Sequence, residues 1–130
     1  MHHIRKIGLL LIREGRLLVV RKRGGTLWIL PGGKPDEGED DETALRREVL
    51  EELGCHVSWS RPYTECTAPA ADLEGVTVTV SCHLGEIAGR PQPRDEIEEI
   101  RWIDLNAPDV PLAISIEEEM IPLLRAEFTD

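Results

Sequence analysis

Short apolar runs separated by turn residues dominate the first thirty positions of the chain. Ile4–Ile12 and Leu17–Val20 are apolar and rich in branched side chains, and Glu14-Gly15 between them predicts a turn. We therefore expect the first two strands to form a hairpin. A third short strand is expected at Thr26–Leu30, because Pro31-Gly32-Gly33 directly after it interrupts regular structure.

The hydrophobic pattern then changes to a helical period. The helix is expected to begin near Asp40 or Asp41, because an aspartate side chain can accept hydrogen bonds from free N–H groups at a helix start. It is expected to end at Leu53, since Gly54 is typical of the position after a helix. The apolar side of this helix is predicted to consist of Leu45, Val49, Leu50 and Leu53.

The second half of the chain is predicted to hold three more strands, two loops and a final helix: strands at His56–Cys66, Val76–Leu84 and Ile97–Asp104, loops at Thr67–Gly75 and Ala88–Arg94, and a helix at Ile114–Glu127. Val76–Leu84 alternates strictly between apolar and polar residues, which is typical of a strand with one buried face. The isoleucines of Ile97–Asp104 do not alternate regularly, which indicates a β-bulge. The order of elements predicts a mixed α/β fold.

Composition narrows the class of protein. The chain of 130 residues is 41% hydrophobic, which predicts one globular domain over residues 1–130. Its net charge of −10 argues against binding a nucleic-acid polymer, and no apolar run is long enough for a membrane span. Three cysteines with no secretory signal predict a cytoplasmic protein. An acidic chain that binds a phosphate ester is expected to need a divalent cation, which inverts the local charge.

A cluster of carboxylates lies in the first predicted helix. Glu48, Glu51 and Glu52 fall within one and a half turns, on an arc of roughly 100° beside the apolar side. Because like charges at this spacing repel, the cluster is expected to have a use, and oxygen ligands suit a hard cation such as Mg²⁺. Taken alone, such a run is also consistent with an ordinary solvated helix face.

The spacing around these glutamates resembles the signature of the Nudix hydrolase family, G-x5-E-x7-R-E-U-x-E-E-x-G-U, where U is a bulky apolar residue. The matching positions are Gly33, Glu39, Arg47, Glu48, Val49, Glu51, Glu52, Gly54 and Cys55. Cys55 stands where Ile, Leu or Val is more usual, which should affect packing and leave the chemistry intact. Leu30-Pro31-Gly32 before the signature and Glu98–Trp102 after it also look like family members.

The resemblance implies an α/β/α sandwich around a mixed β-sheet and hydrolysis of a nucleoside diphosphate linked to another group, with Mg²⁺ or Mn²⁺. By matched position, Glu48, Glu51 and Glu52 are expected to be catalytic metal ligands, and Gly33 offers its carbonyl to the metal. The resemblance also implies that Arg47 orients the glutamates through ion pairs. Either Glu51 or Glu52 could act as the general base.

A further ligand is expected from outside the signature. Glu96, Glu98 and Glu99 are the candidates, and Glu96 is favoured slightly because it lies just ahead of the Ile97–Trp102 run. Basic residues supply candidate phosphate contacts, since positive groups steer anionic ligands. The run Arg21-Lys22-Arg23 could steer or bind ligand phosphates, and an ordinary exposed basic loop is the alternative for it. The substrate-binding candidates are Arg21 and Arg23 of this run, together with Lys34.

The substrate is expected to be a small nucleotide, with a nucleoside triphosphate pyrophosphohydrolase as the leading hypothesis. An ADP-ribose or nucleotide-sugar pyrophosphatase is the second, and Pro69 lies close to the position of a proline marker in the ADP-ribose subgroup. A non-catalytic module that senses nucleotides is a third. It is disfavoured because such modules usually lose glutamates of the signature. Family members often form homodimers, although no segment of this chain requires one.

Overall fold

The computed structural model describes residues 2–70 and 73–129. The strands are β1 (His2–Leu10), β2 (Ile12–Arg13), β3 (Arg16–Lys22), β4 (Gly32–Gly33), β5 (His56–Pro69), β6 (Val76–Ala88) and β7 (Ile97–Asp104). The helices are α1 (Asp41–Leu53), the π-helical segment η1 (Ser115–Met120) and α2 (Ile121–Phe128). None of the helices in the described residues is long and apolar enough to cross a membrane.

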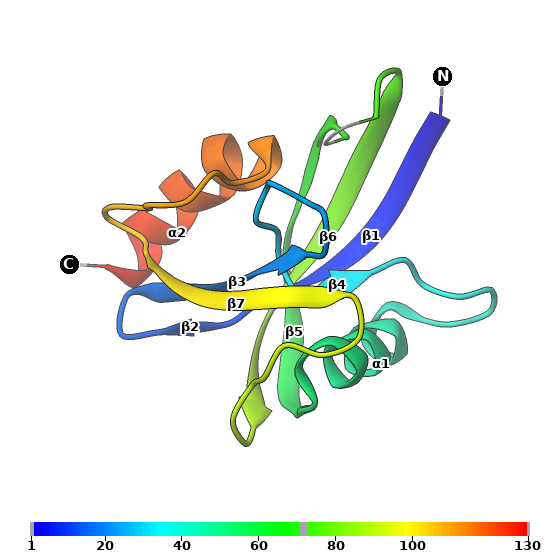
Figure 1. Ribbon diagram of the computed structural model, residues 1–130, viewed down its shortest axis with the longest axis horizontal. Helices are drawn as coiled ribbons and strands as arrows, with labels where there is room; N and C mark the ends of the chain where they lie inside the picture. Colours follow the sequence, from blue (N-terminus) through cyan, green and yellow to red (C-terminus); the bar gives the residue numbers. More distant parts are fainter. Residues whose placement is uncertain (1, 71–72, 130) are drawn as a thin grey trace.

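The strands form two neighbouring sheets. One sheet has the order β4-β1-β6-β5, in which β1 runs parallel to β6 and the other pairs are antiparallel. The second sheet has the order β2-β3-β7 and is antiparallel. Helix α1 lies on one side of the strands, and η1 with α2 lies on the other (Figure 1). The mixed α/β sandwich expected from the sequence is therefore confirmed.

Alternation along β1 builds a core on both sides of the sheet. Leu9 belongs to a cluster with Leu45 and Val49 of α1, whereas its neighbour Leu10 packs in a cluster with Met120 and residues of α2. The predicted apolar side of α1 is correct at Leu45, Val49 and Leu53, which are fully buried. It is wrong at Leu50, which is 42% exposed. Leu50 lies on the flank of the helix that turns away from the sheet.

The predicted first hairpin is only partly correct. The run Ile4–Ile12 divides at Leu11: β1 pairs with β4 and β6, and only β2 pairs with β3. The expected strand at Thr26–Leu30 is wrong, since Trp28 and Ile29 make only isolated bridges. The strand forms instead at Gly32–Gly33, where the sequence predicts an interruption. These glycines can pair with β1 because they carry no side chain at a point of close approach.

The other differences concern lengths and helix type. Strands β5 and β6 extend beyond the predicted ends at Cys66 and Leu84, so the start of the expected loop Thr67–Gly75 is strand, and residues 71 and 72 of that loop lie outside the described residues. The predicted bulge in β7 is confirmed, because the pairing with β3 skips Glu98. The final helix occupies the predicted region, but its first part is π-helical.

Substituting Gly32 with alanine should destabilise the protein strongly. Gly32 has φ of +144°, and a Cβ there would lie 2.0 Å from the carbonyl oxygen of Ile7. We expect a loss of about 3 kcal/mol or more in the free energy of unfolding, measured by urea denaturation. Gly24→Ala is the matched control: Gly24 also has positive φ, +77°, but open space around it, so about 1 kcal/mol is expected. Equal losses for the two variants would contradict the steric explanation.

Candidate metal-binding site

The two glycines of β4 lie directly against glutamates of α1. The N–H of Gly32 donates to Glu52 Oε1 at 2.9 Å. A Cβ on Gly33 would lie 2.6 Å from the carboxyl carbon of Glu48, so only glycine leaves room for that side chain. Helix α1 is fixed at both ends, with Asp40 accepting from the N–H of Thr43 and Gly54 donating to the Leu50 carbonyl. The backbone of β4 and the carboxylates of α1 therefore form one compact unit.

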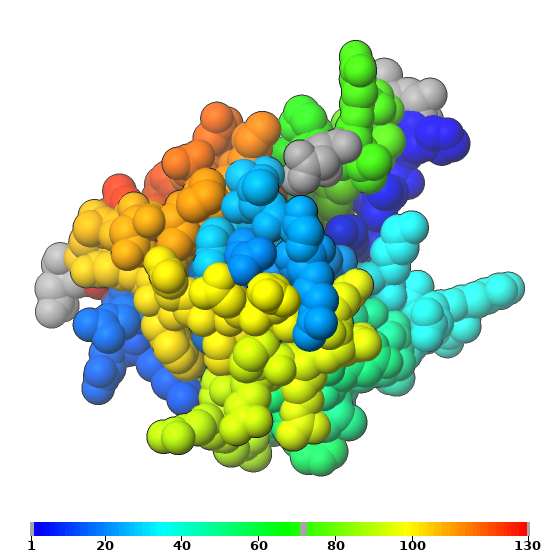
Figure 2. Space-filling model, viewed as in Figure 1, coloured from blue at the N-terminus to red at the C-terminus, as the bar shows by residue number. Residues whose placement is uncertain are grey.

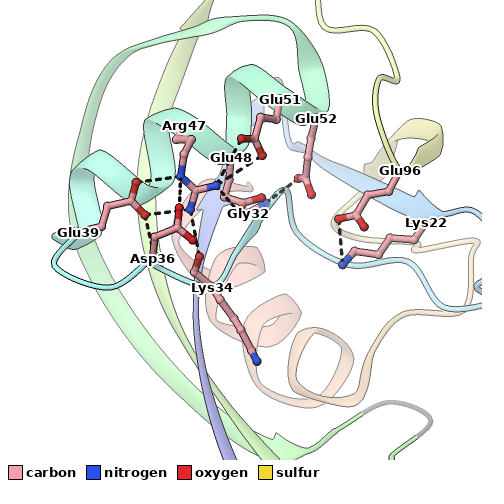
Figure 3. A network of polar contacts seen from close by, with 10 residues as sticks. All are labelled: Lys22, Gly32, Lys34, Asp36, Glu39, Arg47, Glu48, Glu51, Glu52 and Glu96. Atoms are coloured by element: carbon pink, nitrogen blue, oxygen red, sulfur yellow. Dashed lines mark hydrogen bonds and ion pairs between the residues drawn. The ribbon is translucent and has the colours of Figure 1, made fainter.

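Arg47 ties the loop before α1 to the glutamates of the helix. Its guanidinium contacts both carboxylate oxygens of Glu39, at 2.8 and 2.9 Å, and donates to Glu48 Oε1 at 3.0 Å and to the Lys34 carbonyl at 3.2 Å. Glu51 is a longer partner, at 3.5 Å (Figure 3). The hydrogen bonds from Arg47 and the backbone hold the pKa of Glu39 at about 2. Arg47 therefore forms ion pairs with Glu39 and Glu48, and its role in orienting metal ligands stays a prediction.

The three glutamates of the predicted cluster differ in burial. Glu52 is only 1% exposed, whereas the side chain of Glu51 is 46% exposed and that of Glu48 lies between them. Burial raises the pKa of Glu52 to about 8, against the lowering effect of the Gly32 N–H. Burial also raises the pKa of Glu48, although Arg47 opposes it. The glutamate arc does not lie uniformly at the rim of the core, because it turns inward at Glu52.

The donor set fits a hard divalent cation. Glu52 Oε2 is buried and has no hydrogen-bond partner within the described chain, so one carboxylate oxygen is free to act as a ligand. Glu48, Glu51 and the Gly33 carbonyl could supply further oxygen atoms, which Mg²⁺ and Mn²⁺ accept. In residues 2–70 and 73–129, no three acidic, histidine or cysteine side chains already surround one point. In this arrangement Glu48 and Glu51 contact Arg47, at 3.0 and 3.5 Å.

The loop that precedes β7 closes the C-terminal end of α1. The N–H groups of Gln92 and Arg94 donate to the carbonyls of Leu53 and Glu52, at 3.1 and 2.9 Å. This docking brings Glu96 near the glutamates, where its charge helps to raise the pKa of both Glu48 and Glu52. In Figure 3, Glu52 lies between the Arg47 contacts and the Lys22–Glu96 ion pair, whose atoms are 3.3 Å apart.

The other two glutamate candidates have different partners. Glu99 pairs with Arg21 at 2.7 Å, and Glu98 pairs with Arg23 at 3.6 Å. Of the three, Glu96 is the carboxylate whose charge acts on Glu48 and Glu52, which is consistent with the preference for it. Its role as a metal ligand stays a prediction.

A cavity begins beside the β4 glycines and extends to the η1 side of the sheet. Gly32, Gly33, Lys6 and Lys22 line one part of it, and its lining is otherwise mainly small and aliphatic, including Cys66, Cys82, Ile116 and Met120. The sequence interpretation included Lys22 in the basic run Arg21–Arg23 but did not single out Lys6. Lys6 follows Arg5 in the otherwise apolar run Ile4–Ile12, and these two charges in a strand were the available signal.

The predicted phosphate-binding residues differ in their positions. Arg21 and Arg23 do not line the cavity; Arg21 donates to the Gly25 carbonyl as well as to Glu99, and the side chain of Arg23 is 66% exposed. Lys34 is exposed on the segment between β4 and α1, which projects from the body of the molecule (Figures 1 and 2). The structure therefore does not bring the two arginines to the cavity.

Comparisons with known proteins agree with the architecture. A family model described as "NUDIX domain" matches residues 2–125. The crystal structure of a MutT NUDIX hydrolase from Burkholderia pseudomallei has a TM-score of 0.80 at 23% identity, covering 99% of this chain and 100% of that one. A putative nudix hydrolase family member from Chromobacterium violaceum has a TM-score of 0.71 at 26% identity, covering 97% of this chain and 81% of that one.

Curated relatives match over shorter stretches. A putative 8-oxo-dGTP diphosphatase from Bacillus subtilis (strain 168) is 44% identical over 45 residues, which are 35% of this chain and 30% of that protein. An ADP-ribose pyrophosphatase from Methanocaldococcus jannaschii is 26% identical over 97 residues, 72% of this chain and 57% of that protein. The matched regions thus span less than two thirds of the length of these relatives.

The metal-free protein should lose stability as the pH rises. Because the folded-state pKa of Glu52 is about 8, above its ordinary 4.5, the folded state keeps a proton that the unfolded state releases. This contribution is complete below about pH 4.5 and is lost as the pH rises through about 8. In chelator, we expect the melting temperature to fall on the order of 5 °C between pH 5 and pH 8.5.

The variant Glu52→Gln should remove most of this decline, since glutamine stays neutral at every pH. Glu51→Gln removes the same charge from an exposed position of the same helix and should retain the decline. An undiminished decline in Glu52→Gln would contradict the assignment to Glu52.

Proposed function

Because the chain belongs to the NUDIX family, we propose that it is a divalent-metal-dependent hydrolase that cleaves a phosphoanhydride bond in a small nucleotide. A nucleoside triphosphate pyrophosphohydrolase is the leading form of this proposal. The observation that carries it is the buried, unpartnered Oε2 of Glu52, held beside the Gly32–Gly33 backbone and the Arg47-bound Glu48. A structural glutamate in this position would be expected to have both oxygens satisfied.

The residues of the site have separate tasks in this proposal. Glu48, Glu51, Glu52, the Gly33 carbonyl and Glu96 would hold Mg²⁺ or Mn²⁺, which would supply neutralisation of the phosphate charge and activation of the attacking water. Either Glu51 or Glu52 accepts the proton of the attacking water as general base. Arg47 is a positioning residue, because it fixes Glu48 through a network anchored on the opposite side by Glu39.

The substrate assignment rests on the cavity and on the relatives. An apolar cavity next to the glutamates suits a nucleobase, with the phosphates directed toward Gly33. The name of the Bacillus subtilis relative supports a nucleoside triphosphate, and that of the Methanocaldococcus jannaschii relative supports ADP-ribose as the second candidate. The three free, buried cysteines are consistent with a reducing, cytoplasmic setting.

A substrate panel tests this function. Release of pyrophosphate or phosphate from nucleoside triphosphates, ADP-ribose and nucleotide sugars is measured with Mg²⁺, with Mn²⁺ and with excess chelator. We expect turnover of at least one compound, its loss in chelator, and a decrease of roughly 10³-fold or more in kcat for Glu52→Gln. Binding of nucleotides in thermal-shift assays without any turnover would favour the non-catalytic module. Full activity in chelator would contradict the metal-dependent mechanism.

Arg47→Lys should separate positioning from charge. Lysine keeps the positive charge but cannot reproduce the planar contacts to Glu39, Glu48 and the Lys34 carbonyl. We expect the metal concentration for half-maximal activity to rise about tenfold, as for other residues that orient metal ligands.

Arg46→Lys is the matched control for this experiment. Arg46 is the neighbouring arginine of α1, and its carboxylate partner is the exposed Glu42. Its replacement should leave the metal dependence within about twofold of the parent, because exposed pairs contribute little. Equal shifts for both variants would show that Arg47 has no special part in orienting the ligands.

A further inference from the structure

Two of the three lysines of the chain line one cavity, and the third directly follows a glycine of its wall. Lys6 and Lys22 are lining residues, and Lys34 comes after Gly33. The remaining basic side chains of the chain are arginines and histidines. The lysines come from separate segments: Lys6 from β1, Lys22 from the end of β3, and Lys34 from the residue after β4. Burial lowers the pKa of Lys6, and the nearby charges of Lys22 and Lys34 lower it further. The positive charges of Lys22 and Lys34 therefore act on the ammonium group of Lys6.

Lys6 has no charge partner of its own in the structure. Within residues 2–70 and 73–129 its ammonium makes no ion pair within 4 Å and no side-chain hydrogen bond, and the charges of Glu52 and Glu96 act on it only from a distance. Lys22 pairs with Glu96 at 3.3 Å, and in Figure 3 the side chain of Lys34 points away from the Arg47 contacts. A partly buried ammonium near two other cations is costly unless an anion joins them.

The position of the lysines defines the kind of anion. Lys6 and Lys22 line the cavity where its apolar part, with Ile116 and Met120, meets the β4 glycines. Lys6 points to the cavity side of β1, because its neighbour Ile7 packs with α1 on the other side. A nucleotide with its base in the apolar part and its phosphates at Gly33 would have to pass between these lysines.

We propose that Lys6, Lys22 and Lys34 form a phosphate clamp for the polyphosphate chain of the nucleotide, in which Lys6 makes the central contact. The clamp rests on the proposed function for its substrate class and names residues that bind the phosphates. Three ammonium groups on separate segments match a triphosphate or diphosphate better than a monophosphate, because a longer chain of anionic oxygens can reach more than one of them.

Binding of inorganic tripolyphosphate in chelator tests the clamp without any metal. Isothermal titration calorimetry compares the parent protein with Lys6→Met, which keeps the length and apolar stem of the side chain, and with Arg61→Met. Arg61 is an exposed arginine of β5 that does not line the cavity, and its replacement by methionine removes the same charge. We expect Lys6→Met to weaken binding about 10- to 100-fold and Arg61→Met to change it less than about twofold.

A second measurement uses the parent protein alone, in case Lys6→Met folds poorly. Acetylation of the three lysines by an amine-reactive reagent is followed by mass spectrometry, with tripolyphosphate present or absent. Protection of Lys6 and Lys22, with monophosphate much less effective than tripolyphosphate, supports the clamp. Unprotected Lys6, no binding of tripolyphosphate without metal, or equal affinities of Lys6→Met and Arg61→Met would overturn it.

These experiments distinguish a failure of the proposed hydrolase function from a failure of the phosphate clamp. Protected lysines in a protein that hydrolyses none of the nucleotide panel would leave the clamp standing and remove the hydrolase. Metal-dependent turnover with unprotected lysines would keep the hydrolase and remove the clamp.

Discussion

The close approach of the β4 backbone to the carboxylates of α1 is the constraint on which the site depends. Gly32 donates to Glu52, and Gly33 leaves the space that Glu48 occupies. A side chain at Gly33 would collide with Glu48 of the helix, and one at Gly32 would collide with the backbone of β1. The same contact holds Glu52, whose second oxygen has no partner in the described chain, beside the backbone of the proposed metal site.

Charged side chains occupy distinct positions around the contact of β4 with α1, and the net charge of −10 does not reveal this arrangement. On one side, Arg47 forms ion pairs with Glu39 and Glu48. These ion pairs connect the loop before α1 to the helix. On the other side, Lys6 and Lys22 line the cavity. Between the two sides lies Glu52, whose burial raises its pKa to about 8 and whose second oxygen lacks a partner in the described chain. Functional sites often combine buried carboxylates and unpaired cations in this manner.

Strand β1 connects the core with the cavity. Its alternation directs Ile7 and Leu9 toward α1, and directs Lys6 and Gly8 toward the cavity. A strand that is covered on both faces has a nearly continuous apolar sequence. Composition therefore does not distinguish the face of β1 toward α1 from the face toward the cavity. Strand β1 pairs with β6 on one edge and with β4 on the other. This pairing brings the glycines of β4 to the cavity wall.

The sequence by itself determined the features that depend on local spacing. The limits of α1 between Asp40 and Gly54, the phase of the glutamates, the bulge of β7 and the mixed α/β class followed from periodicity, capping residues and the signature. Only the tertiary structure decided which glutamate is buried, that Leu50 is exposed, and that Lys6 lines the cavity. The spacing of residues along a helix gives the direction in which each side chain points from the helix axis. The depth to which that side chain is buried, and its partners, depend on segments far along the chain. The parallel pairing of β1 with β6 and the docking of residues 92–94 on α1 are contacts of that kind, and no local pattern encodes them.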